Sequence, residues 1–90
     1  MTDFERKRVV VTGLGAITPI GNTLAEYWEG LLSGRNGIGP ITLFDASRHD
    51  CRIAGEVKGF SPHDFMDRKD AKRMDRFAQF GVAASKQAIA

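Results

Sequence analysis

The sequence predicts an α/β fold from two observations near its start and one near its end. Residues 9–11 are three consecutive valines, the pattern of a strand that is buried on both faces. A loop rich in glycine follows the valines, and a helical pattern begins at Thr23. A second and longer helical pattern begins at Asp67. A buried strand, a glycine loop and a helix in this order are typical of the entry to a layered α/β fold.

The glycine loop invites comparison with a dinucleotide-binding loop, whose G-x-G-x-x-G pattern runs directly into a helix. Gly13 and Gly15 supply the first two glycines, but Thr18 stands at the third position. Pro19 then disfavours helical dihedral angles at Thr18, so the next helix cannot begin until after Gly21. We therefore expect a structural turn here, with no nucleotide and no other cofactor.

The first helix is predicted from its capping residues. Thr23 and Glu26 fit a capping box, and Gly34 is expected to end the helix. The expected apolar face consists of Leu24, Trp28, Leu31 and Leu32. Trp28 is interpreted as an anchor in the core.

The middle of the chain predicts short elements separated by loops. Residues 35–40 contain two glycines and a proline and are expected to form a loop. Residues 52–57 alternate in character, which predicts a short strand with one exposed face. Ser61 and Pro62 resemble an N-cap and a first helical residue, so a brief helix is expected through Met66.

From Asp67 onward the sequence predicts one amphipathic helix, capped by Asp67 with Asp70 three positions later. At about 100° per residue, its cationic side chains share an arc of roughly 140°. This cationic stripe consists of Arg68, Lys69, Lys72, Arg73 and Arg76. In the later turns Phe80 and Ala83 replace the charges, so these turns are expected to be buried.

The cationic stripe has two interpretations. A solvated helix face usually mixes positive and negative side chains, whereas Asp70 lies off this arc. The alternative is a surface that docks an anionic partner, either an acidic protein or a nucleic acid. Nucleic acid generally requires a larger charge excess, and the net charge is only +2. An acidic protein helix is the favoured partner, and a small nucleic-acid-binding module remains the alternative.

The remaining candidate residues predict no catalytic or metal site. Cys51 is the only cysteine, and no aligned base or helix N-terminus is expected beside it. His49 and His63 have no recognisable zinc-ligand spacing with it. The sequence contains no apolar run long enough to span a membrane, so a cytoplasmic protein is expected. The helical pattern continues to Ala90 without a stop signal, so we expect the chain to be the N-terminal part of a longer protein.

Five motifs follow one another in the chain: RVVVTGLGAITPIGN (8–22), WEGLLSGRNGI (28–38), FDAS (44–47), AGEVKGF (54–60) and DRKDAKRMDRF (67–77). Together they resemble the β-ketoacyl-acyl carrier protein synthases of type II, which are condensing enzymes of fatty-acid synthesis. The motif sequences are most similar to those of bacterial members, of cyanobacterial or plastid type. The resemblance implies a thiolase-like αβαβα layered fold, of which residues 1–90 are the truncated start of the N-terminal domain.

The resemblance also implies an activity and a partner. Such enzymes transfer an acyl chain to a cysteine and then condense it with the carbanion formed by decarboxylating malonyl-carrier protein. The catalytic cysteine and two histidines are expected outside these ninety residues, so the chain itself carries no catalytic residue. The implied docking residues for acyl carrier protein are Lys69, Lys72 and Arg73, with Arg68 and Arg76 as neighbours.

The family further implies a homodimer in the cytoplasm, or in the plastid stroma of a plastid-bearing source. Two alternatives lie within the resemblance: a non-catalytic chain-length factor with the same fold, and a ketosynthase of a polyketide pathway.

Overall fold

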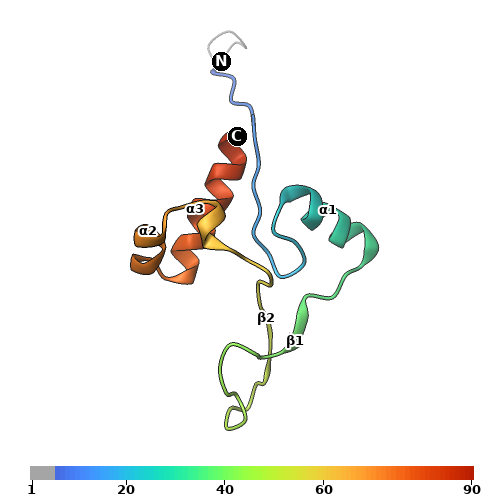
Figure 1. The fold of residues 1–90 in the computed structure, drawn as a ribbon. Helices are drawn as coiled ribbons and strands as arrows, with labels where there is room; N and C mark the ends of the chain where they lie inside the picture. The colour runs from blue at the N-terminus through green and yellow to red at the C-terminus, as the bar shows by residue number, and fades with distance from the viewer. Residues whose placement is uncertain (1–5) are drawn as a thin grey trace.

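A computed structural model describes residues 6–90, and its helices flank an extended N-terminal segment (Figure 1). The radius of gyration is 17.5 Å, against about 12 Å for a compact domain of this length. The buried apolar residues are Ala46, Met66, Ala71 and Ala83. The elements in chain order are α1 (Leu24–Ser33), β1 (Ile38–Pro40), β2 (Ile53–Gly55), the 3-10 helix η2 (Pro62–Asp64), α2 (Arg68–Arg73) and α3 (Arg76–Ile89).

The three valines do not form the predicted buried strand. Val9, Val10 and Val11 are 93%, 74% and 78% exposed, in backbone that is extended but outside any strand. A strand needs a hydrogen-bonded neighbour, and the one sheet among the described residues pairs β1 with β2. The prediction is wrong because residues 6–90 place no strand beside these valines.

Gly13 and Gly15 lie directly against the backbone of α3. A Cβ atom on Gly13 would be 1.9 Å from the carbonyl oxygen of Ala88, and one on Gly15 would be 2.0 Å from that of Ala84. Neither glycine has a positive φ angle. These glycines therefore permit a close approach to the helix, and the structural turn expected in this loop is confirmed only in its later part, at 18–21.

The turn itself lies a few residues later, and the same helix holds the segment that contains it. Thr18 and Gly21 exchange backbone hydrogen bonds of 2.9 and 3.3 Å. Gln87 of α3 accepts from the Ala16 N–H at 3.1 Å and donates to the Asn22 carbonyl at 2.7 Å. Both ends of the loop are therefore tied to one side chain of α3.

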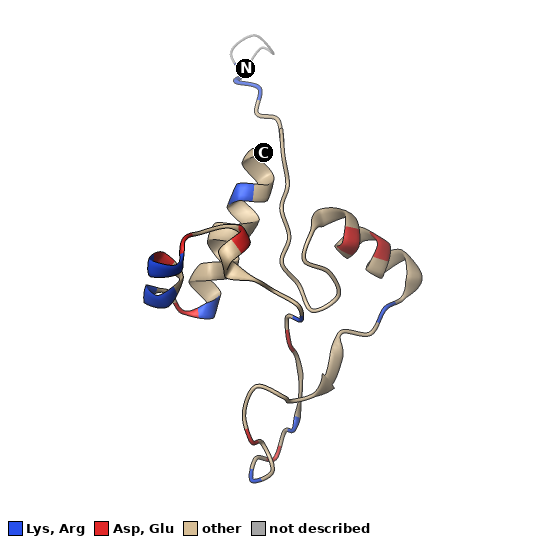
Figure 2. Cartoon of the chain, viewed as in Figure 1, with Lys and Arg blue, Asp and Glu red and all other residues tan. Residues whose placement is uncertain are grey.

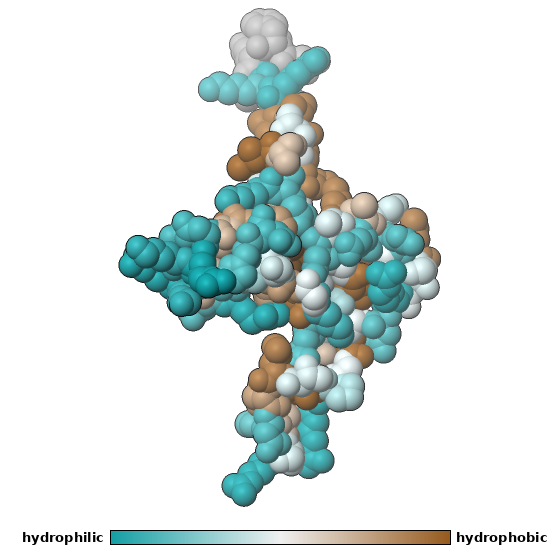
Figure 3. Space-filling model, in the orientation of Figure 1, coloured by the Kyte–Doolittle hydropathy of each residue, from teal (hydrophilic) through white to brown (hydrophobic). Residues whose placement is uncertain are grey.

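The predicted capping of α1 is confirmed, but its apolar face is not buried. The Thr23 hydroxyl accepts from the Glu26 N–H at 3.1 Å, and Gly34 ends the helix with a φ of 70°. Trp28 is 59% exposed and Leu32 is 71% exposed, so Trp28 is not a core anchor among the described residues. Apolar surface also follows the N-terminal segment in Figure 3.

The two short strands form an antiparallel pair in which Gly39 faces Ala54. The prediction of a strand within 52–57 is confirmed for Ile53–Gly55. The loop predicted for 35–40 is wrong at its end, because Ile38–Pro40 pairs with β2. Ile53 is 57% exposed whereas Ala54 is half-buried, so the side with Ala54 faces inward.

Glu56 closes the hairpin by binding the start of the loop between the strands. Its carboxylate accepts from the Thr42 hydroxyl at 2.8 Å and from the N–H groups of Thr42 and Leu43 at 3.2 Å. The hydrogen bond from the Thr42 side chain is the main cause that holds the pKa of Glu56 below its ordinary value of 4.5.

We expect this contact to make stability depend on pH. A carboxyl group whose pKa is lowered by folding stabilises the fold above its ordinary pKa, and the contribution is lost as pH falls through the folded value. Glu56→Gln should therefore be less stable than the wild type above about pH 4.5, and the difference should shrink below it. Urea unfolding of both proteins across this range measures the difference. A difference that grows in acid would contradict the contact.

The helix predicted from Asp67 to the chain end is broken into α2 and α3. Met74 and Asp75 both have extended dihedral angles, with ψ of 138° and 162°. In a continuous helix the Ala71 carbonyl would accept from the Asp75 N–H. Here it accepts from the side-chain amide of Gln79 at 2.9 Å. A tertiary contact thus replaces the bond that would continue the helix.

Candidate docking surface

Helix α2 is short, and contacts at its start and in its middle fix its position. Asp67 caps its start by accepting from the Asp70 N–H at 2.8 Å, as predicted. Ala71 in its middle is 6% exposed. An isolated helix of six residues is unstable in water, so these contacts hold α2 in place.

The cationic side chains of α2 are all exposed, and Figure 2 shows them on both of its turns. Pairs four positions apart lie on the same side of a helix, so the group still spans an arc of roughly 140°. We call this group the α2 cationic surface. It consists of Arg68, Lys69, Lys72 and Arg73.

Arg76 lies on α3 and not on α2, so the predicted stripe of five on a single helix is wrong. It is the first residue of α3, beyond the break. Its guanidinium donates to the Val57 carbonyl at 3.1 Å and lies 5.0 Å from the centre of the Phe80 ring. The guanidinium of Arg76 therefore binds the link between β2 and η2. Its position over the Phe80 ring is also stabilising, as a cation over an aromatic ring generally is.

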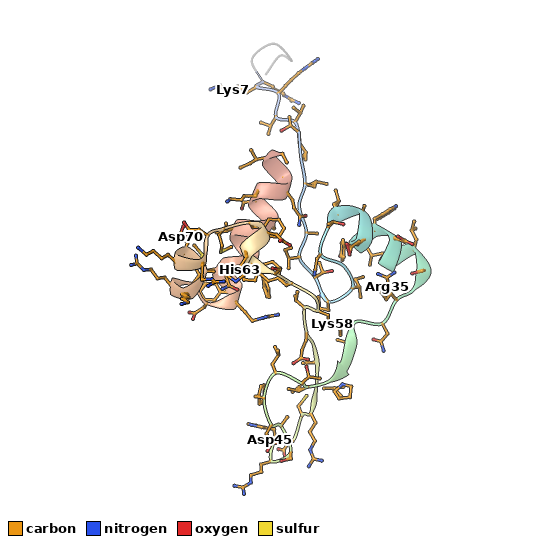
Figure 4. All side chains as sticks on the ribbon, in the orientation of Figure 1. Lys7, Arg35, Asp45, Lys58, His63 and Asp70 are labelled. Carbon is orange, nitrogen blue, oxygen red and sulfur yellow. The ribbon has the colours of Figure 1, made fainter. Side chains whose placement is uncertain are left out.

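Part of the α2 cationic surface borders a shallow depression of about 380 Å³ between η2, α2 and α3. Arg68 and Lys72 line its α2 side, and His63, labelled in Figure 4, lines the η2 side. Gln79 lines it from α3. Two cationic side chains of α2 and the imidazole of His63 thus line one edge of the surface, an arrangement that suits an anionic side chain.

Gln79 is the residue that sequence reasoning missed. Its amide donates to the carbonyls of Ala71 and Met74 at 2.9 and 3.5 Å, and so caps the end of α2 from the next helix. A glutamine within an amphipathic pattern carries no signal of this role in the sequence.

The cysteine and histidines do not assemble into a site among the described residues. Cys51 is exposed, and its thiol donates to the Ile53 carbonyl at 3.3 Å. His49 packs edge-on against Phe44 in the same loop, with ring centres 5.6 Å apart. Residues 6–90 contain no group of three potential metal ligands. No helix in this range is long and apolar enough to cross a membrane.

Comparison with known proteins explains the order of the motifs. A family model described as the N-terminal domain of β-ketoacyl synthase matches residues 6–90. The chain belongs to the β-ketoacyl synthase family.

The type II resemblance is also confirmed by relatives. The protein named 3-oxoacyl-(acyl-carrier-protein) synthase 2 from Synechocystis sp. is 70% identical over 89 residues, which is 99% of this chain. The protein of the same name from Vibrio cholerae is 48% identical over 96% of the chain.

A solved structure has the same local fold. It is named the ishigamide ketosynthase/chain length factor, and it matches 93% of the chain with a TM-score of 0.85 and 40% identity. The chain covers 21% of that structure, and 21% of the Synechocystis and Vibrio relatives. The chain therefore corresponds to about a fifth of a ketosynthase. It forms an α/β part of a domain of the thiolase-like family.

Proposed function

We propose that the chain is the opening portion of a β-ketoacyl-acyl carrier protein synthase with the thiolase-like layered fold. The complete enzyme condenses an acyl-enzyme thioester with the carbanion from malonyl-carrier protein, using a cysteine and two histidines outside these residues. The names of the relatives support this activity, since they are 3-oxoacyl-(acyl-carrier-protein) synthases. A soluble homodimer in the cytoplasm is part of the proposal.

Within that enzyme, we assign the α2 cationic surface a role in docking acyl carrier protein. The observation that carries this assignment is four exposed cations on one short helix whose position is fixed by its contacts. Long-range attraction between charged surfaces speeds the encounter of partners that bind weakly and exchange repeatedly. Lys69, Lys72 and Arg73 are the central residues, with Arg68 beside them.

The test is the salt dependence of condensation by the full-length protein. The Debye length falls from about 10 Å at 0.1 M salt to about 3 Å at 1 M, so docking by exposed charges weakens. We expect KM for malonyl-carrier protein to rise with salt, while KM for a carrier-free malonyl thioester changes little. Equal salt dependence for both substrates would contradict docking by charge, and the absence of any condensation would contradict the enzyme assignment.

A non-catalytic chain-length factor is the second candidate, because the matching solved structure is named a ketosynthase/chain length factor. Such a protein would have the fold and the docking surface without the nucleophile. Incubation of the full-length protein with an acyl-carrier-protein thioester, followed by intact mass measurement, separates the two. An acyl adduct on the protein supports the synthase, and its absence supports the chain-length factor.

A further inference from the structure

We propose that Gln79 is a positioning residue that sets the direction in which α2 presents its cations to the carrier protein. This inference rests on the proposed docking function and extends it to a residue that carries no charge. Gln79 lies on α3, and its side chain is partly buried between α3 and the end of α2.

Gln79 acts at the end of α2, where backbone acceptors need partners. The last carbonyl groups of a helix have no partner within that helix and need donors from elsewhere. The Met74 N–H reaches Ala71 only at 3.3 Å, as the closing bond of the last turn. The Gln79 amide adds a bond of 2.9 Å to the same carbonyl and reaches Met74 at 3.5 Å. One side chain therefore supplies donors to the carbonyl groups at the break.

The position of the break makes this contact important for docking. Met74 and Asp75 are extended and contribute no helical bond that would fix the angle between α2 and α3. The Gln79 amide crosses that break. A long helix such as α3, with fourteen residues, is a rigid support, whereas α2 with six residues is not. Gln79 thus couples the orientation of the α2 cationic surface to α3.

A second observation ties Gln79 to the surface itself. It lines the same depression as Arg68 and Lys72, which are two of the proposed docking cations. A change at Gln79 should therefore affect docking geometry while the charges stay the same. That combination separates positioning from electrostatics.

The test uses Gln79→Met in the full-length enzyme, since methionine has a similar volume and no N–H donor. We expect KM for malonyl-carrier protein to rise about fivefold, the value of one net hydrogen bond, with kcat and KM for a carrier-free thioester unchanged. The matched control is Gln87→Met, on the same helix, whose amide bonds Ala16 and Asn22 instead. It should leave KM for the carrier-bound substrate unchanged.

Gln79→Asn provides a second variant, because it retains the amide but shortens the side chain by one methylene group. It should raise KM for the carrier-bound substrate in the same way. A wild-type KM in both Gln79 variants overturns the inference, and so does an equal rise for both substrates. If reversing the charges of Lys69, Lys72 and Arg73 also leaves KM unchanged, the proposed docking function fails as well. If that reversal raises KM and the Gln79 variants do not, only the positioning role fails.

Discussion

Gly15→Ala is expected to lower the stability of the full-length protein by about 3 kcal/mol, near the upper end of the usual cost of overpacking. The added Cβ atom would lie 2.0 Å from the carbonyl oxygen of Ala84 and 2.9 Å from Cβ of Gln87. Neither atom can move away cheaply, because one belongs to the helix backbone and the other is attached to it. The N-terminal segment would have to separate from α3.

Separation would also break the bonds that Gln87 makes to Ala16 and Asn22, which lie close to Gly15 along the chain. Thermal unfolding, with soluble yield as a second readout, measures the effect. Gly81→Ala is the matched control on α3, where, apart from the neighbouring backbone of the helix itself, no described atom lies within 4 Å of the added carbon. Because alanine is the better helix former, this control should match the wild type or exceed it by up to about 1 kcal/mol. Equal unfolding temperatures for the two variants would contradict the close approach of the segment to α3.

Reversal of three charges to glutamate, at Lys69, Lys72 and Arg73, is expected to raise KM for malonyl-carrier protein roughly tenfold or more. Each exposed ion pair is worth about 0.2–1 kcal/mol, and reversal replaces attraction by repulsion at each position. About 1.4 kcal/mol corresponds to a tenfold change in affinity. Steady-state kinetics with carrier-bound and carrier-free substrates measures it, and the carrier-free reaction should keep its kcat and KM.

The same change in net charge can be made elsewhere as a control. Arg6, Lys7 and Arg8 are exposed at the other end of the described chain, and their reversal to glutamate also changes the net charge by −6. If the α2 cationic surface docks the carrier protein, this control should have the smaller effect on KM. Equal effects from both triple variants would show that net charge matters and the position of the charges does not.

The local elements were predictable because their signals lie within a few residues of one another. Thr23 caps the amide three positions later, and Asp67 does the same for Asp70. Gly34 adopts the left-handed conformation that ends a helix. These bonds form within one turn of chain, so residue type and spacing determine them. The order of five motifs likewise identified the β-ketoacyl synthase family.

The break in the predicted long helix could not be read from the sequence. Helical propensity continues through Met74, and the contact that competes with it comes from Gln79 in the following helix. The consequence for function is specific. At 100° per residue a continuous helix would carry Arg76 in the same stripe, whereas the break places it on α3, where it bonds to Val57.

The order of motifs along the chain was enough to identify the family, and residue type at short spacing was enough to predict the N-caps of α1 and α2 and four of the five grouped cations. Only the tertiary structure decided that Gly13 and Gly15 serve a close contact with α3, and that the valines lie exposed among the described residues. Gln87 is 71 positions from Ala16, and no local pattern records that they meet. The physical reason is that burial and close packing depend on what the chain brings alongside a residue, which its neighbours in sequence do not specify.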